Sequence, residues 1–317
     1  MQRAFRRIVF GTLCHLAVTL SCLATAAQAD LAPLPVKLAA PGIYVHIGRQ
    51  QTADASNRGD IANIGFIVGD RCVAVIDTGG SPAVGERLRL AVRAATPRPI
   101  CYVINTHMHP DHVLGNAAFR GNGETPEFVG HAHLAAALAT RAAIYRRALE
   151  RDTGERVDAG DVVLPDRLVK ATLDLDLGGR RLQLRAWPTA HTDNDLTVFD
   201  EATGTLWLAD LLFVEHTPAV DGSLRGWLAV MAELAAMNPQ RVICGHGETA
   251  DWRAALAAQE RYLRVLLDGT RAAIRSGKSL AQAVESVGRS EQGRWLLFDD
   301  FHRRNVTAAY AELEWED

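Results

Sequence analysis

Three histidines and one aspartate lie close together in one polar segment of the chain, residues 105–112. They are His107, His109, Asp111 and His112. Neutral imidazole and carboxylate groups are ligands that suit zinc, and the segment contains no cysteine. Across a tight loop, His107 and His109 can bind one ion together. Asp111 and His112 come about one turn later and are better placed for a second ion. We therefore interpret this segment as part of a metal site.

Three more candidate ligands come at the ends of short apolar segments that we predict to be β-strands. His191 follows residues 182–187, Asp210 follows residues 205–209, and His246 follows residues 241–244. Open sheets usually place their ligands at strand ends, so these three side chains can converge on the histidine-rich loop. The resulting hypothesis is a site with seven ligands.

The elements that must position these ligands alternate between strands and helices. The sequence predicts strands in residues 43–47, 64–68, 72–76 and 101–104, hairpins around residues 178–179 and 201–204, and helices in residues 82–95, 133–149, 224–237 and 254–274. This pattern favours mixed sheets covered by helices. We expect an extended segment over residues 30–41, one metal-binding domain over residues 42–250, and a helical extension over residues 251–317 that packs on the same domain.

The composition is that of an ordinary globular protein. The 317 residues are 48% hydrophobic and 22% charged, which excludes a disordered or collagen-like chain. Without residues 1–29 the net charge changes from -3 to -6, because that segment holds three arginines and no acidic residue. An acidic protein without a basic appendage binds polyanions poorly, so we expect no nucleic-acid partner.

Residues 1–29 are typical of a secretory signal peptide. Arginines near the start precede a short apolar stretch, residues 8–20, and Ala-Gln-Ala at residues 27–29 fits a cleavage site. The apolar stretch is short for a bilayer span, which needs ~20 residues. We expect cleavage after Ala29, export to the periplasm and no membrane insertion of the mature chain. Lipidation at Cys22 is the alternative.

Three cysteines lie outside this leader, namely Cys72, Cys101 and Cys244. An odd number does not imply a complete disulfide framework. Cys72 and Cys101 both lie in apolar, strand-like segments. We therefore interpret them as small buried apolar residues rather than metal ligands.

These motifs resemble those of the metallo-β-lactamase superfamily over about residues 41–248. The resemblance rests on Asp77 in Val-Ile-Asp-Thr-Gly, the H-x-H-x-D-H segment, His191, Asp210 and Gly-His246-Gly. It implies an α/β fold, the αββα sandwich, in which two mixed sheets are flanked by helices and two metal ions lie at one edge.

The resemblance also implies two ligand sets: His107, His109 and His191 for a first zinc ion, and Asp111, His112 and His246 for a second. Asp210 is expected to bridge the two ions, and Asp77 to support the loop from outside the ligand set. The implied cofactor is two Zn²⁺ per chain, and manganese or iron would also be compatible with these ligands.

Two positions narrow the choice among the subgroups of this superfamily. Asp210 stands where some lactamases have cysteine and others serine, and in this respect the chain is similar to glyoxalase II. His109 stands where redox-active diiron members have glutamate, which speaks against redox chemistry. Residues 57–66 together with the histidine-rich loop resemble the exported zinc metallohydrolases associated with quinoprotein and sulfur-oxidation relay systems.

We therefore predict an exported dinuclear zinc hydrolase of a small molecule. A metal-bridging hydroxide would attack an ester, thioester or related carbonyl group, with Asp111 as the catalytic residue that orients the nucleophile or accepts its proton. β-Lactam hydrolysis is the first alternative. A non-catalytic, metal-bearing accessory protein is the second, and the ligand set disfavours it because structural zinc sites are closed by four ligands.

Other polar residues stay undecided at this level. His133, Asp195 and His216 could line the pocket or only close turns, and Arg58 and Asp60 could belong to a flap over the site. The helical C-terminal region offers a possible anion contact consisting of Arg261, Tyr262, Arg264 and Arg271. For that set a solvated helix face is the favoured interpretation.

Overall fold

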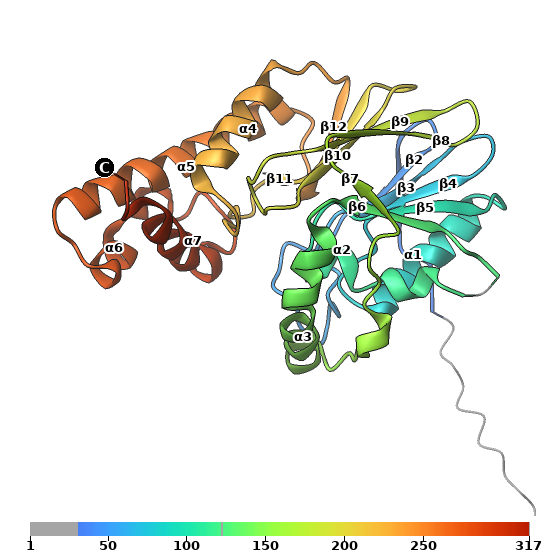
Figure 1. Cartoon of the computed structure of the whole chain (residues 1–317), viewed down its shortest axis with the longest axis horizontal. Coiled ribbons are helices and arrows are strands. Elements are labelled where there is room, and N and C mark those ends of the chain that lie inside the picture. Colours follow the sequence, from blue (N-terminus) through green and yellow to red (C-terminus); the bar gives the residue numbers. More distant parts are fainter. Residues whose placement is uncertain (1–30, 122, 317) are drawn as a thin grey trace, which may run out of the picture. The chain divides into compact units, whose positions relative to one another are not determined.

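The computed structural model describes residues 31–121 and 123–316, so the predicted signal peptide lies outside the described residues. The strands form two sheets that face each other (Figure 1). The first sheet has seven strands in chain order: β1 (Lys37–Ala40), β2 (Ile43–His46), β3 (Ile64–Val68), β4 (Val73–Ile76), β5 (Ile100–Ile104), β6 (Glu127–His131) and β7 (Arg167–Val169). The second has five strands in the spatial order β12-β11-β10-β9-β8: β8 (Thr172–Asp176), β9 (Arg181–Ala186), β10 (Leu196–Asp200), β11 (Thr205–Phe213) and β12 (Arg241–His246).

Both sheets are mixed, as the sequence predicts. Strands β1 to β4 pair antiparallel and β4 to β7 pair parallel. In the second sheet β8 to β11 pair antiparallel, and β12 joins β11 in parallel. The helices are α1 (Pro82–Ala95), α2 (Pro110–Val113), α3 (Leu134–Thr153), α4 (Leu224–Ala236), α5 (Trp252–Arg275), α6 (Leu280–Ser286) and α7 (Phe298–Leu313).

Side chains from the inner faces of both sheets fill the space between them. Strand β4 is covered on both faces. Its side chains point alternately to the two faces of the sheet, and all four of its residues are buried. Ala74 and Ile76 belong to the core between the sheets, whereas Val73 and Val75 pack with α1 on the outer face. Helices α4 and α5 pack on the second sheet through a core that includes Trp227, and α7 packs on α5. The predicted αββα sandwich is therefore confirmed.

Cys72 is buried, as predicted, and Cys101 is partly buried, but the odd cysteine count does not predict that the two pair. The two form a disulfide, with their Cα atoms 5.8 Å apart. Cys72 directly precedes β4, and Cys101 lies in the neighbouring parallel strand β5. The odd cysteine count misleads because the third cysteine, Cys244, is buried and free.

Within the described residues, no helix combines the length and the apolar character that crossing a bilayer requires.

Candidate metal centre

Buried polar groups fix the backbone of the histidine-rich loop where it leaves β5. Asp77 is fully buried and accepts hydrogen bonds from the backbone amide and the hydroxyl of Thr106, at 2.8 and 2.7 Å. The side chains of Asn105 and Asn116 exchange hydrogen bonds of 3.0 and 2.7 Å across the loop. A buried network in which each donor has an acceptor favours one arrangement of the chain. Asp77 thus supports the loop, as expected.

His107, His109 and His191 converge on one point. Nδ1 of His109 lies 3.1 Å from Nε2 of His107 and 3.0 Å from Nε2 of His191. Oδ2 of Asp210 lies 3.6 Å from Nε2 of His107 and 3.4 Å from Nε2 of His191. Ligand atoms bound to one tetrahedral zinc ion at about 2.1 Å lie about 3.4 Å apart, so these separations suit a single ion. We call these four residues the first ligand group.

Asp111, His112 and His246 form a second ligand group beside the first. Oδ2 of Asp111 lies 3.7 Å from Nε2 of His112 and 3.4 Å from Nε2 of His246. Asp210 reaches this group as well, because its Oδ1 lies 3.2 Å from Nε2 of His112 and its Oδ2 lies 3.4 Å from Nε2 of His246. The structure thus brings together all seven residues that the sequence singles out, and one carboxylate contacts both groups.

Two atoms at the centre are buried without a hydrogen-bond partner among the described residues, Nε2 of His112 and Oδ1 of Asp210. They face each other at 3.2 Å. A buried polar atom without a partner costs about 1–3 kcal/mol, and native proteins retain few of them. A divalent cation bound between these groups would satisfy both atoms. The residues therefore fit a metal centre built from imidazole and carboxylate ligands.

The second nitrogen of each ligand histidine is held by another group, which fixes the ring. The contacts are His107 Nδ1 with the Thr106 hydroxyl at 3.1 Å, His112 Nδ1 with Asp77 at 2.9 Å, His191 Nδ1 with the Ala219 carbonyl at 2.7 Å, His246 Nδ1 with the Ile61 carbonyl at 3.0 Å, and His109 Nε2 with Asp221 at 3.1 Å. The nitrogen left for a metal ion is therefore Nε2 in four of the rings and Nδ1 in His109.

Asp210 lies inside β11, and the prediction that it ends the strand is wrong. All nine residues of β11 are buried, and the strand continues to Phe213. Its pairing with β12 shifts register on both sides of Ala209, whose φ of 45° is rare for a residue other than glycine. Gly245 on β12 leaves room for the carboxylate, because a Cβ atom there would lie 1.8 Å from Oδ1 of Asp210. A bulge and a glycine thus accommodate this ligand in mid-strand.

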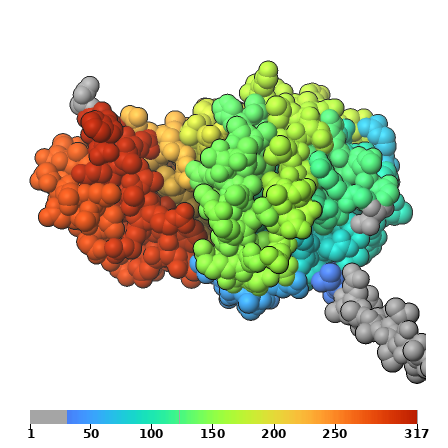
Figure 2. Space-filling model, turned by 60° about the horizontal axis from the view of Figure 1, so that its bottom comes forward, coloured from blue at the N-terminus to red at the C-terminus, as the bar shows by residue number. Residues whose placement is uncertain are grey.

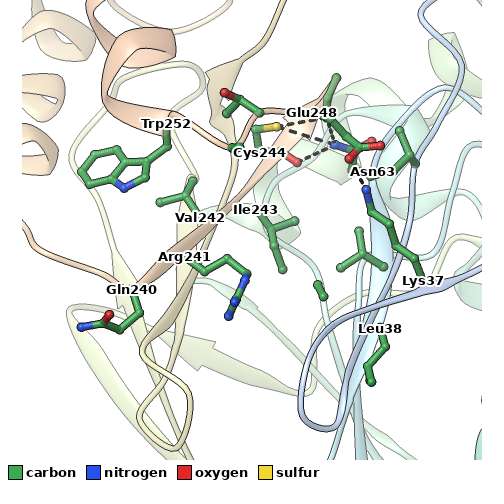
Figure 3. A pocket seen from close by; sticks show the side chains of 16 residues that line it. Lys37, Leu38, Asn63, Gln240, Arg241, Val242, Ile243, Cys244, Glu248 and Trp252 are labelled. Carbon is green, nitrogen blue, oxygen red and sulfur yellow. Dashed lines mark hydrogen bonds and ion pairs between the residues drawn. The ribbon is translucent and has the colours of Figure 1, made fainter.

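His246 is the last residue of β12, and Asn63 lies beside Cys244, two residues before it (Figure 3). Nδ2 of Asn63 donates hydrogen bonds to the carbonyls of Cys244 and Gly247, at 2.9 and 2.7 Å, and so ties down the chain on both sides of His246. A cavity of about 470 Å³ opens beside these contacts, lined by residues of β1 and β12 and by Trp252. None of the seven candidate ligands lines it, so this cavity and the metal centre are separate.

The two ligand groups differ in the pKa values of their histidines. Burial and neighbouring imidazoles hold the pKa of His107 well below its usual value and lower the pKa of His191 to about 3. In the second group burial acts in the same direction, but nearby carboxylates outweigh it. They raise the pKa of His246 to about 9 and that of His112 well above its usual value. Without metal at pH 7, His107 and His191 are therefore neutral. His112 and His246 are charged.

Comparison with known families agrees with this geometry. The family model of the metallo-beta-lactamase superfamily matches residues 57–246, more than half of the chain. The chain belongs to the metallo-β-lactamase superfamily. It is accordingly a metal-dependent hydrolase, with His and Asp groups suited to divalent ions.

Two solved structures share the fold of this chain. The metallo-beta-lactamase from Pontibacter korlensis has a TM-score of 0.58 and 18% identity, over 73% of this chain and 99% of that chain. The stereoselective inverting sec-alkylsulfatase Pisa1 from Pseudomonas sp. has a TM-score of 0.67 and 17% identity, over 89% of this chain and 51% of that chain. Residues 1–250 are about four fifths of the sequence, so the second alignment includes part of the C-terminal helices. Comparison with curated proteins finds no match.

Two regions of this superfamily member flank the metal centre. On the α3 side, Asp221 accepts hydrogen bonds from Nε2 of His109 and from Arg141. Asp221 could not be predicted from the sequence, because it stands alone in a loop and no pattern marks it. On the other side, the buried His216 lies 5.0 Å from the ring of His246 and 4.8 Å from the ring of Phe301 in α7, between ring centroids. Figure 2 shows the green surface of α3 and the red surface of the C-terminal helices on one face.

The other undecided residues near His191 have structural roles. Asp195 accepts hydrogen bonds from the amide and hydroxyl of Thr192, and so closes the turn after His191. His133 is exposed, and its Nδ1 contacts the backbone carbonyl of Asp193. In the part of the chain that the structure describes, neither residue belongs to a ligand group.

The flap and the C-terminal residues also find partners. Arg58 pairs with Glu155, and the buried Asp60 pairs with His46 at 2.6 Å. Asp60 directly precedes Ile61, whose carbonyl holds His246. The C-terminal arginines pair with carboxylates: Arg261 with Glu291, Arg264 with Glu260, and Arg271 with Glu316. The solvated helix face is confirmed for these arginines. Tyr262 is instead buried and bonded to His302.

Proposed function

We propose that this protein is an exported dinuclear zinc hydrolase that cleaves an ester, thioester or related carbonyl compound. The position of Asp210 is the observation that carries this proposal, because its two oxygens lie within 3.6 Å of ligand atoms from both groups. The three histidines of the first group would hold one ion, and Asp111, His112 and His246 the other. Asp210 would bind both.

Two bound zinc ions would supply Lewis acidity towards a water nucleophile and towards the substrate carbonyl. Asp111 is the residue we assign to proton transfer. Burial would raise the pKa of Asp111, but the charges of His112 and His246 lower it below its usual value, so the carboxylate stays ionised. Its side chain is 13% exposed, whereas that of Asp210 is 4% exposed. An ionised carboxylate at the accessible side of the centre can orient the nucleophile and accept its proton.

Metal analysis tests the dinuclear zinc assignment. The purified protein is stripped with a chelator, reloaded with zinc, manganese or iron, and analysed for bound metal and for stability. We expect two ions per chain, with zinc held most tightly, because imidazole and carboxylate ligands suit it. Binding of one ion per chain would overturn the dinuclear proposal, and a preference for manganese or iron would overturn the metal identity alone.

A parallel substrate test decides the reaction. S-lactoylglutathione, nitrocefin and aryl esters are offered to the zinc-loaded protein, with the metal-free protein as control. Turnover of a thioester or ester supports the proposal. Rapid turnover of nitrocefin alone would favour a β-lactam hydrolase, and two bound zinc ions without turnover of any compound would favour the accessory role.

Two observations support export. The signal-like residues 1–29 are one, and the Cys72–Cys101 disulfide is the other, because disulfides persist in oxidising compartments and are rare in the cytosol. The resemblance of residues 57–66 to quinoprotein-associated metallohydrolases suggests the pathway in which the enzyme acts. Fractionation of cells that express the full chain, followed by N-terminal sequencing, should find a periplasmic protein that begins at Asp30. A cytoplasmic protein with reduced cysteines would contradict export.

A further inference from the structure

One face of α3 packs on the loop that carries four of the candidate ligands. Its buried leucines, Leu134, Leu138 and Leu149, share a core with apolar residues of that loop. Residues three or four apart lie on the same side of a helix, so Arg141 and Tyr145 continue this stripe between Leu138 and Leu149. Polar groups on a packed helix face cost free energy unless they have a partner. Arg141 and Tyr145 therefore need an explanation other than packing.

Arg141 contacts the metal centre through Asp221. Its guanidinium donates a hydrogen bond of 2.7 Å to Oδ2 of Asp221, the same oxygen that lies 3.1 Å from Nε2 of His109. A guanidinium has five N–H donors, and this hydrogen bond uses one of them. The Arg141 side chain is 39% exposed. Donors are therefore available to a molecule that approaches His109.

The hydroxyl of Tyr145 is buried beside Arg141, and its proton has no acceptor among the described residues. It lies within electrostatic reach of Arg141, Asp221 and Asp111. Burial raises the pKa of Tyr145 to about 12, so the hydroxyl keeps its proton and remains a donor. Its ring packs on the α3 core, where a phenylalanine ring would fill the same space.

We propose that Arg141 and Tyr145 bind an oxyanion group of the substrate, such as a carboxylate, beside the metal centre. This inference rests on the proposed function and adds the substrate class, a carbonyl compound with a negative charge near the bond that is cleaved. Arginine recognises such a group with charge-assisted, forked hydrogen bonds, and the tyrosine hydroxyl adds a neutral donor. Asp221 fixes the distance between this anion site and His109, because it holds both His109 and Arg141.

Thiol binding to the cobalt-substituted protein tests the proposal without requiring turnover. A thiolate bound to cobalt gives a charge-transfer absorption, which yields a Kd. Mercaptocarboxylates with two, three or four methylenes are each compared with the mercapto-alcohol of the same length. For the best length we expect the wild-type protein to favour the carboxylate about tenfold, the effect of one charge-assisted hydrogen bond. Because both thiols bind the same ion, their ratio is independent of changes in metal affinity.

Three variants assign the preference to residues. Arg141→Gln should reduce the ratio to about one, and Tyr145→Phe should reduce it about threefold. The melting temperature of Tyr145→Phe should be unchanged or higher, because the substitution removes a buried donor without an acceptor. Arg147→Gln is the matched control. Arg147 lies on α3, is exposed, and lines a separate cavity with Ala143, so this variant should keep the wild-type ratio.

The outcomes separate this inference from the proposed function. Equal affinity for both thiols at every length in the wild-type protein would overturn the anion site, as would an unchanged ratio in Arg141→Gln. A protein that binds no cobalt and shows no charge-transfer band would overturn the metal centre itself, and the anion site with it.

Discussion

The two ligand groups share Asp210 but are built differently. In the first group buried imidazoles face one another, and its outer member, His109, is held by Asp221, whose side chain is 26% exposed. In the second group imidazoles face carboxylates, and His112 is held by Asp77, whose side chain is 0% exposed. One group thus relies on partly exposed support, and the other on a buried carboxylate network.

Because of this difference, protons and metal ions compete mainly at the second group. A histidine binds a metal ion only in its neutral form. In the first group His107 and His191 are already neutral at pH 7, because burial holds the pKa of His107 well below its usual value and lowers that of His191 to about 3. The second group must first release protons, because carboxylates raise the pKa of His246 to about 9. We therefore expect the first ion to be held at all ordinary pH values and the second to be exchangeable.

Replacement of the shared ligand should give the largest effect. In Asp210→Ala the second group loses a contact to His112 and to His246, and we expect one bound zinc ion per chain instead of two. The lost ion removes several kcal/mol of transition-state stabilisation, which at about 1.4 kcal/mol per tenfold corresponds to about a thousandfold in kcat. Metal analysis and kinetics measure both. Asp174→Asn, an exposed carboxylate on β8, is the control, and unchanged zinc stoichiometry in Asp210→Ala would rule out the bridging role.

The pH dependence of zinc affinity should give the next largest effect, and it should differ between the two ligand groups. Below pH 9 His246 is protonated in the metal-free protein, so each ion that binds to the second group must displace a proton. Because His112 must lose a proton as well, the affinity of that group should rise at least about tenfold per pH unit, or at least about a hundredfold from pH 6 to pH 8. The affinity of the first group should change little over that range. Competition with a chelator at several pH values measures both constants, and two equal slopes would show that the groups do not differ.

Replacement of Asp77, the buried carboxylate that holds His112, should weaken zinc binding at the second group although every ligand is kept. In Asp77→Asn an amide replaces a carboxylate that accepts hydrogen bonds from Thr106 and His112, and an amide can accept at only one of its two ends. We expect zinc affinity at the second group to fall about 10- to 100-fold. Asp200→Asn serves as control, since Asp200 is a buried carboxylate paired with Arg180 at the β10–β11 hairpin. Loss of zinc affinity in both variants would point to general destabilisation instead.

Much of the metal centre could be predicted because most of its candidate ligands lie in short segments with a recognisable residue pattern. The spacing of residues 105–112 puts four ligands into one loop, and the fold class follows from the alternation of strands and helices. His191 and His246 could be chosen because each follows a short apolar segment and has polar or glycine neighbours in the sequence. These features do not depend on which strands pair.

The remaining features depend on pairing partners that the sequence does not reveal. The place of Asp210 within β11 requires the register shift against β12 and the space at Gly245. The disulfide requires that β4 and β5 be neighbours, which a cysteine count cannot show. Asp221 lies in a loop without any motif, and it contacts His109 only because the fold brings residues 112 positions apart together.

Replacement of Asp221, the partly exposed carboxylate that holds His109, should give the smallest effect. It is the counterpart of the Asp77 variant. Asp221→Asn makes the same chemical change as Asp77→Asn, but the new amide oxygen can still accept from Nε2 of His109, and water can reach the partly exposed site. We expect zinc affinity at the first group to fall less than about tenfold, below the range for buried support. Chelator competition on both variants gives the two ratios directly. If Asp221→Asn cost more than Asp77→Asn, then the charge on the support, and not its burial, would decide how firmly each group holds its ion.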